Sequence, residues 1–188
     1  GAAPVVIDGI TFEFIDAAAS EAPAEFMFYL PDFKALCSSE VATGTFHNVL
    51  TQRGAKARDT LNWSKAIATA LRSYGDKSDV VFGSHNWPTW GADNVKTFLT
   101  HHRDTYRFIH DQTMRLANSG ETATEIAEQV GEPTFAKSDF STRGYYGTYN
   151  HNAKAVFQFY FGWWDGVPAN YNRHVPTEEA KRYIAAMG

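Results

Sequence analysis

FMFYLPDFKALC, residues 26–37, is the stretch that decides the fold expected of this chain. Residues 26–30 form an aromatic and aliphatic run typical of a β-strand, Pro31 and Asp32 end that run, and residues 35–37 can form another strand. Similar runs of β-branched and aromatic residues predict further strands at 5–10, 11–15 and 80–82. We therefore expect the chain to be rich in β-structure up to about Trp90.

Helical patterns take over after Pro88. Residues 93–118 carry apolar side chains at helical spacing, and Gly120 follows them as a C-terminal stop signal. An earlier helix is expected at 62–74, capped by Thr60 or Asn62, and later helices at 122–130, 152–164 and 177–187. The pattern predicts an α/β part over residues 1–90 and an all-α part over residues 91–188.

Composition narrows the possible functions. The chain has 188 residues and a net charge of -4, so it lacks the basic excess that sequence-independent nucleic-acid binding requires. No apolar run approaches the roughly 20 residues of a membrane span, and the single cysteine, Cys37, excludes an intrachain disulfide. Aromatic residues make up 15% of the chain, which suggests an apolar pocket or an interface.

Two acids and one histidine form the first candidate site. Glu21 lies between two predicted strands, Glu40 follows the run at 35–37, and His85 follows the run at 80–82. Side chains at strand ends can converge, and carboxylates together with imidazole suit zinc and similar metals. The alternative reading is that the acids are solvated loop carboxylates and that the histidine is packed under Trp87.

Basic and aromatic loops form the second candidate site. Arg53 and Arg58 occupy a glycine-containing loop, and a guanidinium can grip sulfate, phosphate or carboxylate oxygens in pairs. Residues 141–152 add Tyr146 and His151 on a second loop rich in hydrogen-bond donors. Exposed arginines paired with nearby acids, and tyrosines at an interface, remain the alternative readings.

Six strings taken together resemble the alkyl sulfatases of the metallo-β-lactamase superfamily. They follow the order and compatible spacings of that family over about residues 9–170: EAPAE (21–25), LCSSE (36–40), HN with RGAKARD (47–48 and 53–59), SHNWPTWG (84–91), RFIHDQT (107–113) and RGYYG (143–147). The resemblance implies part of a metallo-β-lactamase αββα sandwich over 1–90 and a helical dimerisation domain over 91–188. It also implies a homodimer and an alkyl sulfate substrate.

The same resemblance implies a site with two zinc ions. Carried over by motif, Glu21 binds the first zinc ion, Glu40 bridges both, and His85 binds the second. Arg53 contacts the sulfate and His151 lies close enough to act as an acid, while Arg58 and Tyr146 line the same cavity. Hydrolysis by a metal-activated water would then release an alcohol and sulfate.

One expected part of the family pattern is absent from this sequence. The family's His-x-His-x-Asp-His string, which supplies other zinc ligands, does not occur, and neither does the trailing sterol-carrier-like domain. We therefore expect a fragment or processed product that is inactive alone and that an N-terminal polypeptide could complete. A hydrolase of another ester or lactone, and an inactive dimerisation module, remain alternatives; the resemblance favours a periplasmic or secreted protein.

Overall fold

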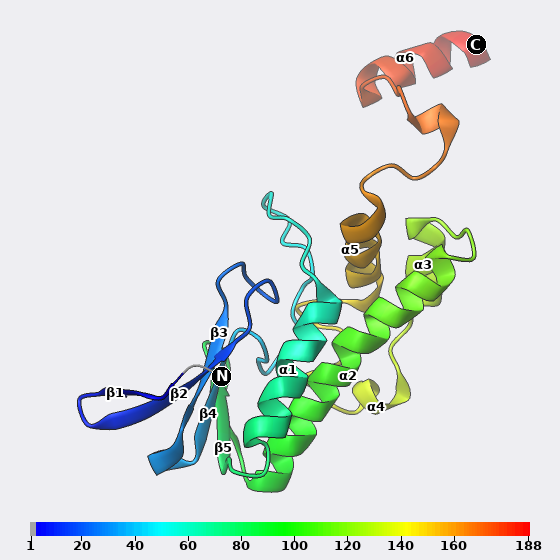
Figure 1. Cartoon of the computed structure of the whole chain (residues 1–188). Helices are drawn as coiled ribbons and strands as arrows, with labels where there is room; N and C mark the ends of the chain where they lie inside the picture. Colours follow the sequence, from blue (N-terminus) through cyan, green and yellow to red (C-terminus); the bar gives the residue numbers. More distant parts are fainter. Residues whose placement is uncertain (1–2) are drawn as a thin grey trace.

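The computed structural model describes residues 3–188 and places a mixed six-stranded sheet beside a layer of helices (Figure 1). The strands lie in sequence order across the sheet: β1 (Val5–Ile7), β2 (Ile10–Asp16), β3 (Phe26–Leu30), β4 (Ala35–Ser39), β5 (Val80–Gly83) and β6 (Thr89–Trp90). All neighbouring pairs are antiparallel except β4 and β5, which are parallel. The connection between those two strands carries α1 (Thr60–Tyr74), as a parallel crossover requires.

Local turn chemistry fixes the hairpins of the sheet. Asp8 and Gly9, between β1 and β2, both have positive φ angles, of 49° and 81°. An Asp-Gly pair in this conformation makes a two-residue turn whose twist matches the twist of the strands it joins. The short 3-10 helix η1 (Pro31–Phe33) makes the next tight connection, between β3 and β4.

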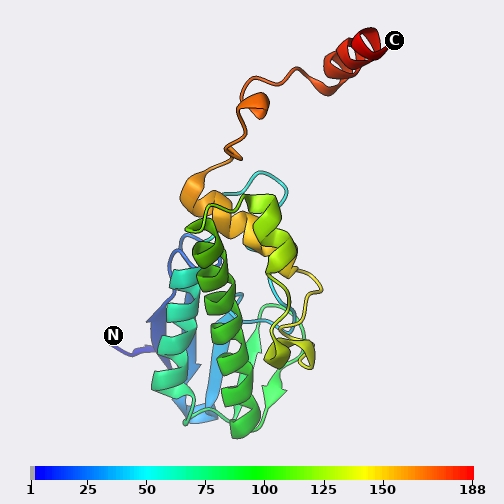
Figure 2. The same cartoon turned by 90° about the vertical axis from the view of Figure 1, so that its right-hand side faces the viewer.

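Helices α1 and α2 (Ala92–Ala117) cover one face of the sheet (Figures 1 and 2). Alternate strand residues point toward these helices, because successive side chains of a strand face opposite sides. The core beneath the helices combines residues of the strands, of α1 and of α2, among them Met27, Leu36, Val81, Trp63, Ile67, Leu99 and Ile109. The side-chain oxygen of Asp59 accepts a hydrogen bond from Asn62 N, so the predicted caps of α1, Thr60 and Asn62, are wrong.

Phenylalanines dominate the opposite face of the sheet. The rings of Phe14 and Phe28 lie 6.2 Å apart, Phe14 and Phe26 lie 5.6 Å apart, and Phe28 reaches Phe82 on β5 at 6.3 Å. No helix of residues 3–188 covers this face in either view (Figures 1 and 2). An aromatic sheet face with no second layer is apolar surface available for packing.

The later helices pack beside α2 or lie beyond it. They are α3 (Ala123–Gln129), α4 (Thr134–Lys137), α5 (Tyr149–Phe161) and α6 (Pro176–Met187), with the 3-10 helix η2 (Pro168–Asn170) before α6. Leu116 of α2 packs with Ile126, Val130 and Ala153 in a second apolar cluster. Helix α6 buries none of its residues and extends away from the rest of the chain (Figure 2).

The predicted fold class, an α/β sheet followed by a helical part, is confirmed. Helix α2 contributes to the same core as the strands, while the division at residues 90 and 91 stays a prediction. Helix α5 starts at Tyr149 rather than at residue 152, because Thr148 caps it by accepting from His151 N. No helix of the described residues is long and apolar enough to cross a membrane.

Candidate metal centre and its relatives

Two loops bring two carboxylates and an imidazole together. Glu21 comes from the β2–β3 loop, Glu40 follows β4 directly, and His47 lies on the segment between β4 and α1. One ligand atom from each of these side chains lies within 4.8 Å of the others. His47 Nε2 is 3.5 Å from Glu40 Oε2 and 3.8 Å from Glu21 Oε1.

A strained turn at the end of β4 aims the Glu40 side chain. Ser39 has a positive φ of 51°, a conformation that side-chain-bearing residues adopt rarely. Its hydroxyl donates to Phe26 O at 2.6 Å, and its carbonyl oxygen accepts from Ser84 N at 3.0 Å. Gly83 permits that approach, because a Cβ there would lie 2.7 Å from Ser39 O. The turn is therefore held from two sides.

Burial and charge distinguish Glu21 from an ordinary loop carboxylate. Its side chain is 8% exposed, and its Oε1 atom is paired with the Arg58 guanidinium. Glu25 lies close by, since its Oε1 atom accepts from Glu40 N at 3.4 Å. Burial raises the pKa of Glu25 above its ordinary value, and the charges of Glu21 and Glu40 raise it further.

His47 is buried with a defined hydrogen-bond partner. Its Nδ1 atom lies 3.0 Å from Asn48 O, an acceptor, and 3.2 Å from Arg58 Nη1, a donor. Burial lowers the pKa of His47 below its ordinary value, and the nearby charge of Arg58 acts in the same direction. The favoured neutral ring directs Nε2 at two carboxylates, an arrangement that fits a divalent cation among the three groups.

His85 lies at the edge of this cluster. Its Nε2 atom is 3.1 Å from Glu40 Oε1, and its side chain is 62% exposed. The structure therefore brings two of the predicted metal ligands, Glu21 and Glu40, together with His47, which the sequence reading placed only beside the basic loop, and it places His85 against Glu40. The string HN at 47–48 was the available signal, but nothing local to it indicates that the ring is buried against two acids.

The predicted substrate residues are placed differently from one another. Tyr146 packs against the edge of the His47 ring at a centroid distance of 5.1 Å, with a side chain that is largely exposed. Arg58 lies inside the cluster. His151 contacts Leu50 O at 2.9 Å through Nε2, and Arg53 lies on the exposed loop before α1, without a hydrogen bond or ion pair to the described residues. Their assigned roles stay predictions.

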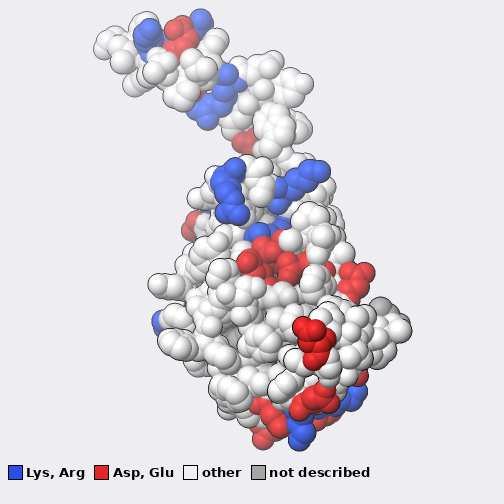
Figure 3. Space-filling model, turned by 90° about the vertical axis from the view of Figure 1, so that its left-hand side faces the viewer, with Lys and Arg blue, Asp and Glu red and all other residues white. Residues whose placement is uncertain are grey.

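Charged side chains are unevenly distributed over the sheet side of the molecule. Figure 3 shows acidic side chains gathered in the middle of this face and basic side chains above them.

Within the cluster of Glu21, Glu40 and His47, carboxylates this close repel each other unless protons or cations compensate their charge. The donor set of carboxylate oxygens and imidazole nitrogens suits zinc.

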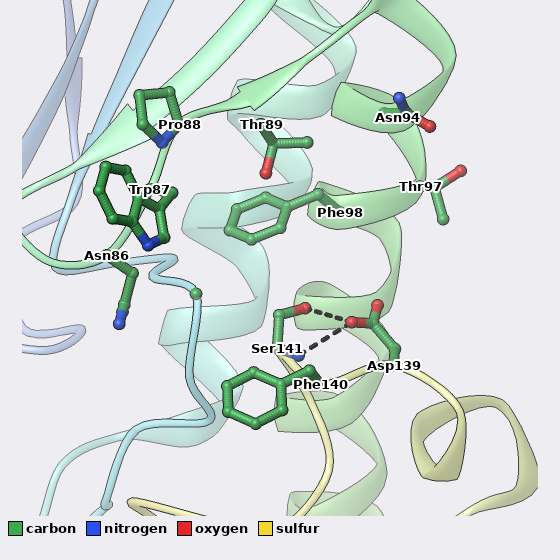
Figure 4. Close-up of a pocket in the computed structure, with 11 residues that line it drawn as sticks. Asn86, Trp87, Pro88, Thr89, Asn94, Thr97, Phe98, Asp139, Phe140 and Ser141 are labelled. Carbon is green, nitrogen blue, oxygen red and sulfur yellow. Dashed lines mark hydrogen bonds between the residues drawn. The ribbon is translucent and has the colours of Figure 1, made fainter.

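A separate cavity of about 430 Å³ lies beside the loop that carries His85 (Figure 4). Trp87 and Phe140 supply apolar walls, and Asp139 Oδ1 accepts from Ser141 N at 2.9 Å and from Ser141 Oγ at 2.7 Å. None of the predicted site residues lines this cavity.

Comparison with known proteins shows what this chain is similar to. The chain is 50% identical to the linear primary-alkylsulfatase of Pseudomonas sp over 183 residues, covering 97% of this chain and 27% of that protein. It is 44% identical over 182 residues to the alkyl/aryl-sulfatase BDS1 of Saccharomyces cerevisiae, covering 97% of this chain and 28% of that protein. This chain is a homologue of the alkyl sulfatases.

Structure and domain content agree with that assignment. The alkyl sulfatase homologue superposes on the stereoselective inverting sec-alkylsulfatase Pisa1 from Pseudomonas sp. with a TM-score of 0.94 and 42% identity, covering 99% of this chain and 30% of that one. The family described as alkyl sulfatase dimerisation matches residues 122–188, which hold α3 to α6. The resemblance found in the sequence is confirmed, and the homologue spans between a quarter and a third of the length of these relatives.

Proposed function

We propose that this chain is part of a zinc-dependent hydrolase that converts alkyl sulfate esters to an alcohol and inorganic sulfate. One observation carries the proposal: Glu21, Glu40 and His47 converge, with His85 beside them, in a chain that is 50% identical to a linear primary-alkylsulfatase. Acids and imidazoles gathered from separate loops are typical of a metal centre.

Glu21, Glu40 and His85 would hold a pair of zinc ions, with Glu40 shared between them. His47 offers a further imidazole nitrogen on the same side of Glu40 as Glu21. Bound there, zinc would lower the pKa of a coordinated water enough to supply a nucleophile near neutral pH. The remaining ligands would come from polypeptide outside this sequence.

The other predicted residues would handle the substrate. Arg53, on its exposed loop, would bind the sulfate oxygens through its planar fork, and Tyr146 would line the substrate site from the opposite loop. His151, at the start of α5, would provide a proton to the departing oxygen. The exposed aromatic residues of 159–164 would offer apolar surface to an alkyl chain.

Two uncovered surfaces fit a larger assembly. The phenylalanine face of the sheet would pack against the other half of a metallo-β-lactamase αββα sandwich, supplied by an N-terminal polypeptide. The region 122–188, with the exposed apolar side chains of α6, would join two copies in a homodimer. A periplasmic or secreted location is part of the same proposal.

Complementation tests the proposed function. The chain is purified alone and after co-expression with the remainder of the Pseudomonas linear primary-alkylsulfatase, and both samples are assayed for bound zinc and for sulfate released from dodecyl sulfate. We expect zinc and turnover in the complemented sample. A folded, dimeric, complemented protein without zinc and without sulfate release would contradict the proposal and favour a dimerisation module.

A further inference from the structure

We propose that Arg58 is a positioning residue of the metal centre, which locks the Glu21 loop to the His47–Asn48 segment in the conformation that receives a cation. This inference rests on the metal-dependent function proposed above. It assigns Arg58 a role inside the protein, in place of contact with the substrate.

The guanidinium of Arg58 joins two loops that are distant in sequence. Its Nε atom donates to Glu21 O at 2.5 Å, and its Nη2 atom donates to the carboxylate of the same residue. Its Nη1 atom donates to Asn48 O at 2.8 Å and to Asn48 Oδ1 at 2.7 Å. One planar group therefore fixes the main chain and the side chain of both Glu21 and Asn48.

Donor count argues against a direct role in sulfate binding. A guanidinium has five N–H donors, and the four bonds to Glu21 and Asn48 occupy all but one of them. The Arg58 side chain is also only 14% exposed. It cannot present the free pair of donors that bidentate binding of a sulfate requires.

The placement of Arg58 also supports the His47 ring. Nη1 lies 3.2 Å from His47 Nδ1, and the same carbonyl oxygen of Asn48 accepts from Arg58 and contacts His47 Nδ1. Holding that carbonyl fixes the partner that orients the imidazole, which leaves Nε2 directed at Glu21 and Glu40. Groups that orient metal ligands in this way typically change metal affinity by about 10- to 100-fold when they are removed.

Two substitutions of Arg58, by lysine and by methionine, distinguish its role in positioning the loops from the effect of its positive charge. Arg58→Lys keeps the positive charge, but a single ammonium cannot span the two loops, while Arg58→Met removes the charge as well. Arg53→Met is the matched control, because it removes an arginine from the exposed part of the same segment, where no contact to the described residues is lost.

Cobalt titration of the complemented protein provides the readout, followed by the visible absorption of bound Co²⁺ and by calorimetry. Arg58→Lys is expected to weaken Co²⁺ binding by about tenfold or more and to change the absorption spectrum. Arg53→Met should leave both unchanged and raise the KM for dodecyl sulfate. Thermal unfolding of each metal-free variant shows whether Arg58→Lys keeps the fold.

Two results would overturn the inference in distinguishable ways. Wild-type Co²⁺ affinity and an unaltered spectrum in folded Arg58→Lys would show that Arg58 does not position the ligands, while the proposed hydrolase would stand. Absence of Co²⁺ binding by the wild-type protein would overturn the metal-dependent function and this inference with it. Should Arg58→Met not fold, Arg58→Lys alone decides.

Discussion

His47 Nε2 lies 3.5 Å from Glu40 Oε2, and the contact joins a buried ring to a residue held at a strained turn. Burial lowers the pKa of His47, so the neutral ring is favoured and cannot neutralise the neighbouring acids. Glu21 is paired with Arg58, whereas the charge partners of Glu40 among residues 3–188 are His47 and His85. A bound cation would supply the compensation that Glu40 lacks.

Glu40→Gln should therefore weaken metal binding without harming the metal-free fold. The amide is close in shape to the carboxylate, and it removes the charge that repels Glu21 and Glu25. We expect Co²⁺ affinity to fall by at least about tenfold, with an unchanged or raised melting temperature in the metal-free protein. Asp32→Asn, which changes an exposed acid within η1, is the control; equal effects of the two substitutions would refute a special role for Glu40.

Gly147→Ala should disturb the site from the opposite loop. A Cβ at Gly147 would lie 2.3 Å from His47 O, and Gly147 N donates to Phe46 O at 2.6 Å, so backbone would have to move. Overpacking of this kind costs about 1–3 kcal/mol in the free energy of unfolding. Urea unfolding measures the loss, and Gly131→Ala, where a Cβ would meet no atom within 4 Å, should be nearly neutral.

Stability should fall as the pH drops below the ordinary histidine pKa of about 6.5. His102 is fully buried between Phe98 O and Thr43 O, each 2.8 Å from a ring nitrogen, and burial lowers its pKa. In this pH range His102 is protonated in the unfolded chain more readily than in the folded chain. The free energy of unfolding therefore rises with pH in this range. His102→Gln should flatten the pH dependence of urea unfolding between pH 7 and pH 5; an unchanged slope would exclude His102 as its source.

Ile184→Asp should shift a dimer of the chain toward the monomer. Ile184 is 71% exposed on α6, between Tyr183 and Met187, which are also exposed. Burying a carboxylate at an apolar contact costs several kcal/mol, whereas the same charge in solvent costs little. Light scattering coupled to size exclusion gives the mass, with Lys181→Asp on the same helix as the control. Identical masses for both variants and the wild type would place the dimer contact elsewhere.

Local sequence patterns predicted most of the strands and helices and much of the candidate metal centre. Alternation and turn residues located five of the six strands, and helical spacing located α2 to within one residue at each end. The two-residue strand β6 and the four-residue helix α4 were not predicted, because elements this short depend on their neighbours more than on their own sequence. The capping box of α3 uses Thr122 and Glu125, at the start of the helix expected over 122–130.

The sequence by itself determined most of the segments that become strands and helices, the resemblance to the alkyl sulfatases, and the grouping of Glu21 with Glu40. Periodicity and motif spacing are local properties, so they can be read before folding. Only the tertiary structure decided that His47 faces both acids and that Arg58 turns inward, 37 residues away from its partner Glu21. Those outcomes depend on which loops the sheet brings together. Hydrogen bonds form between groups that are close in space, whatever their separation along the chain.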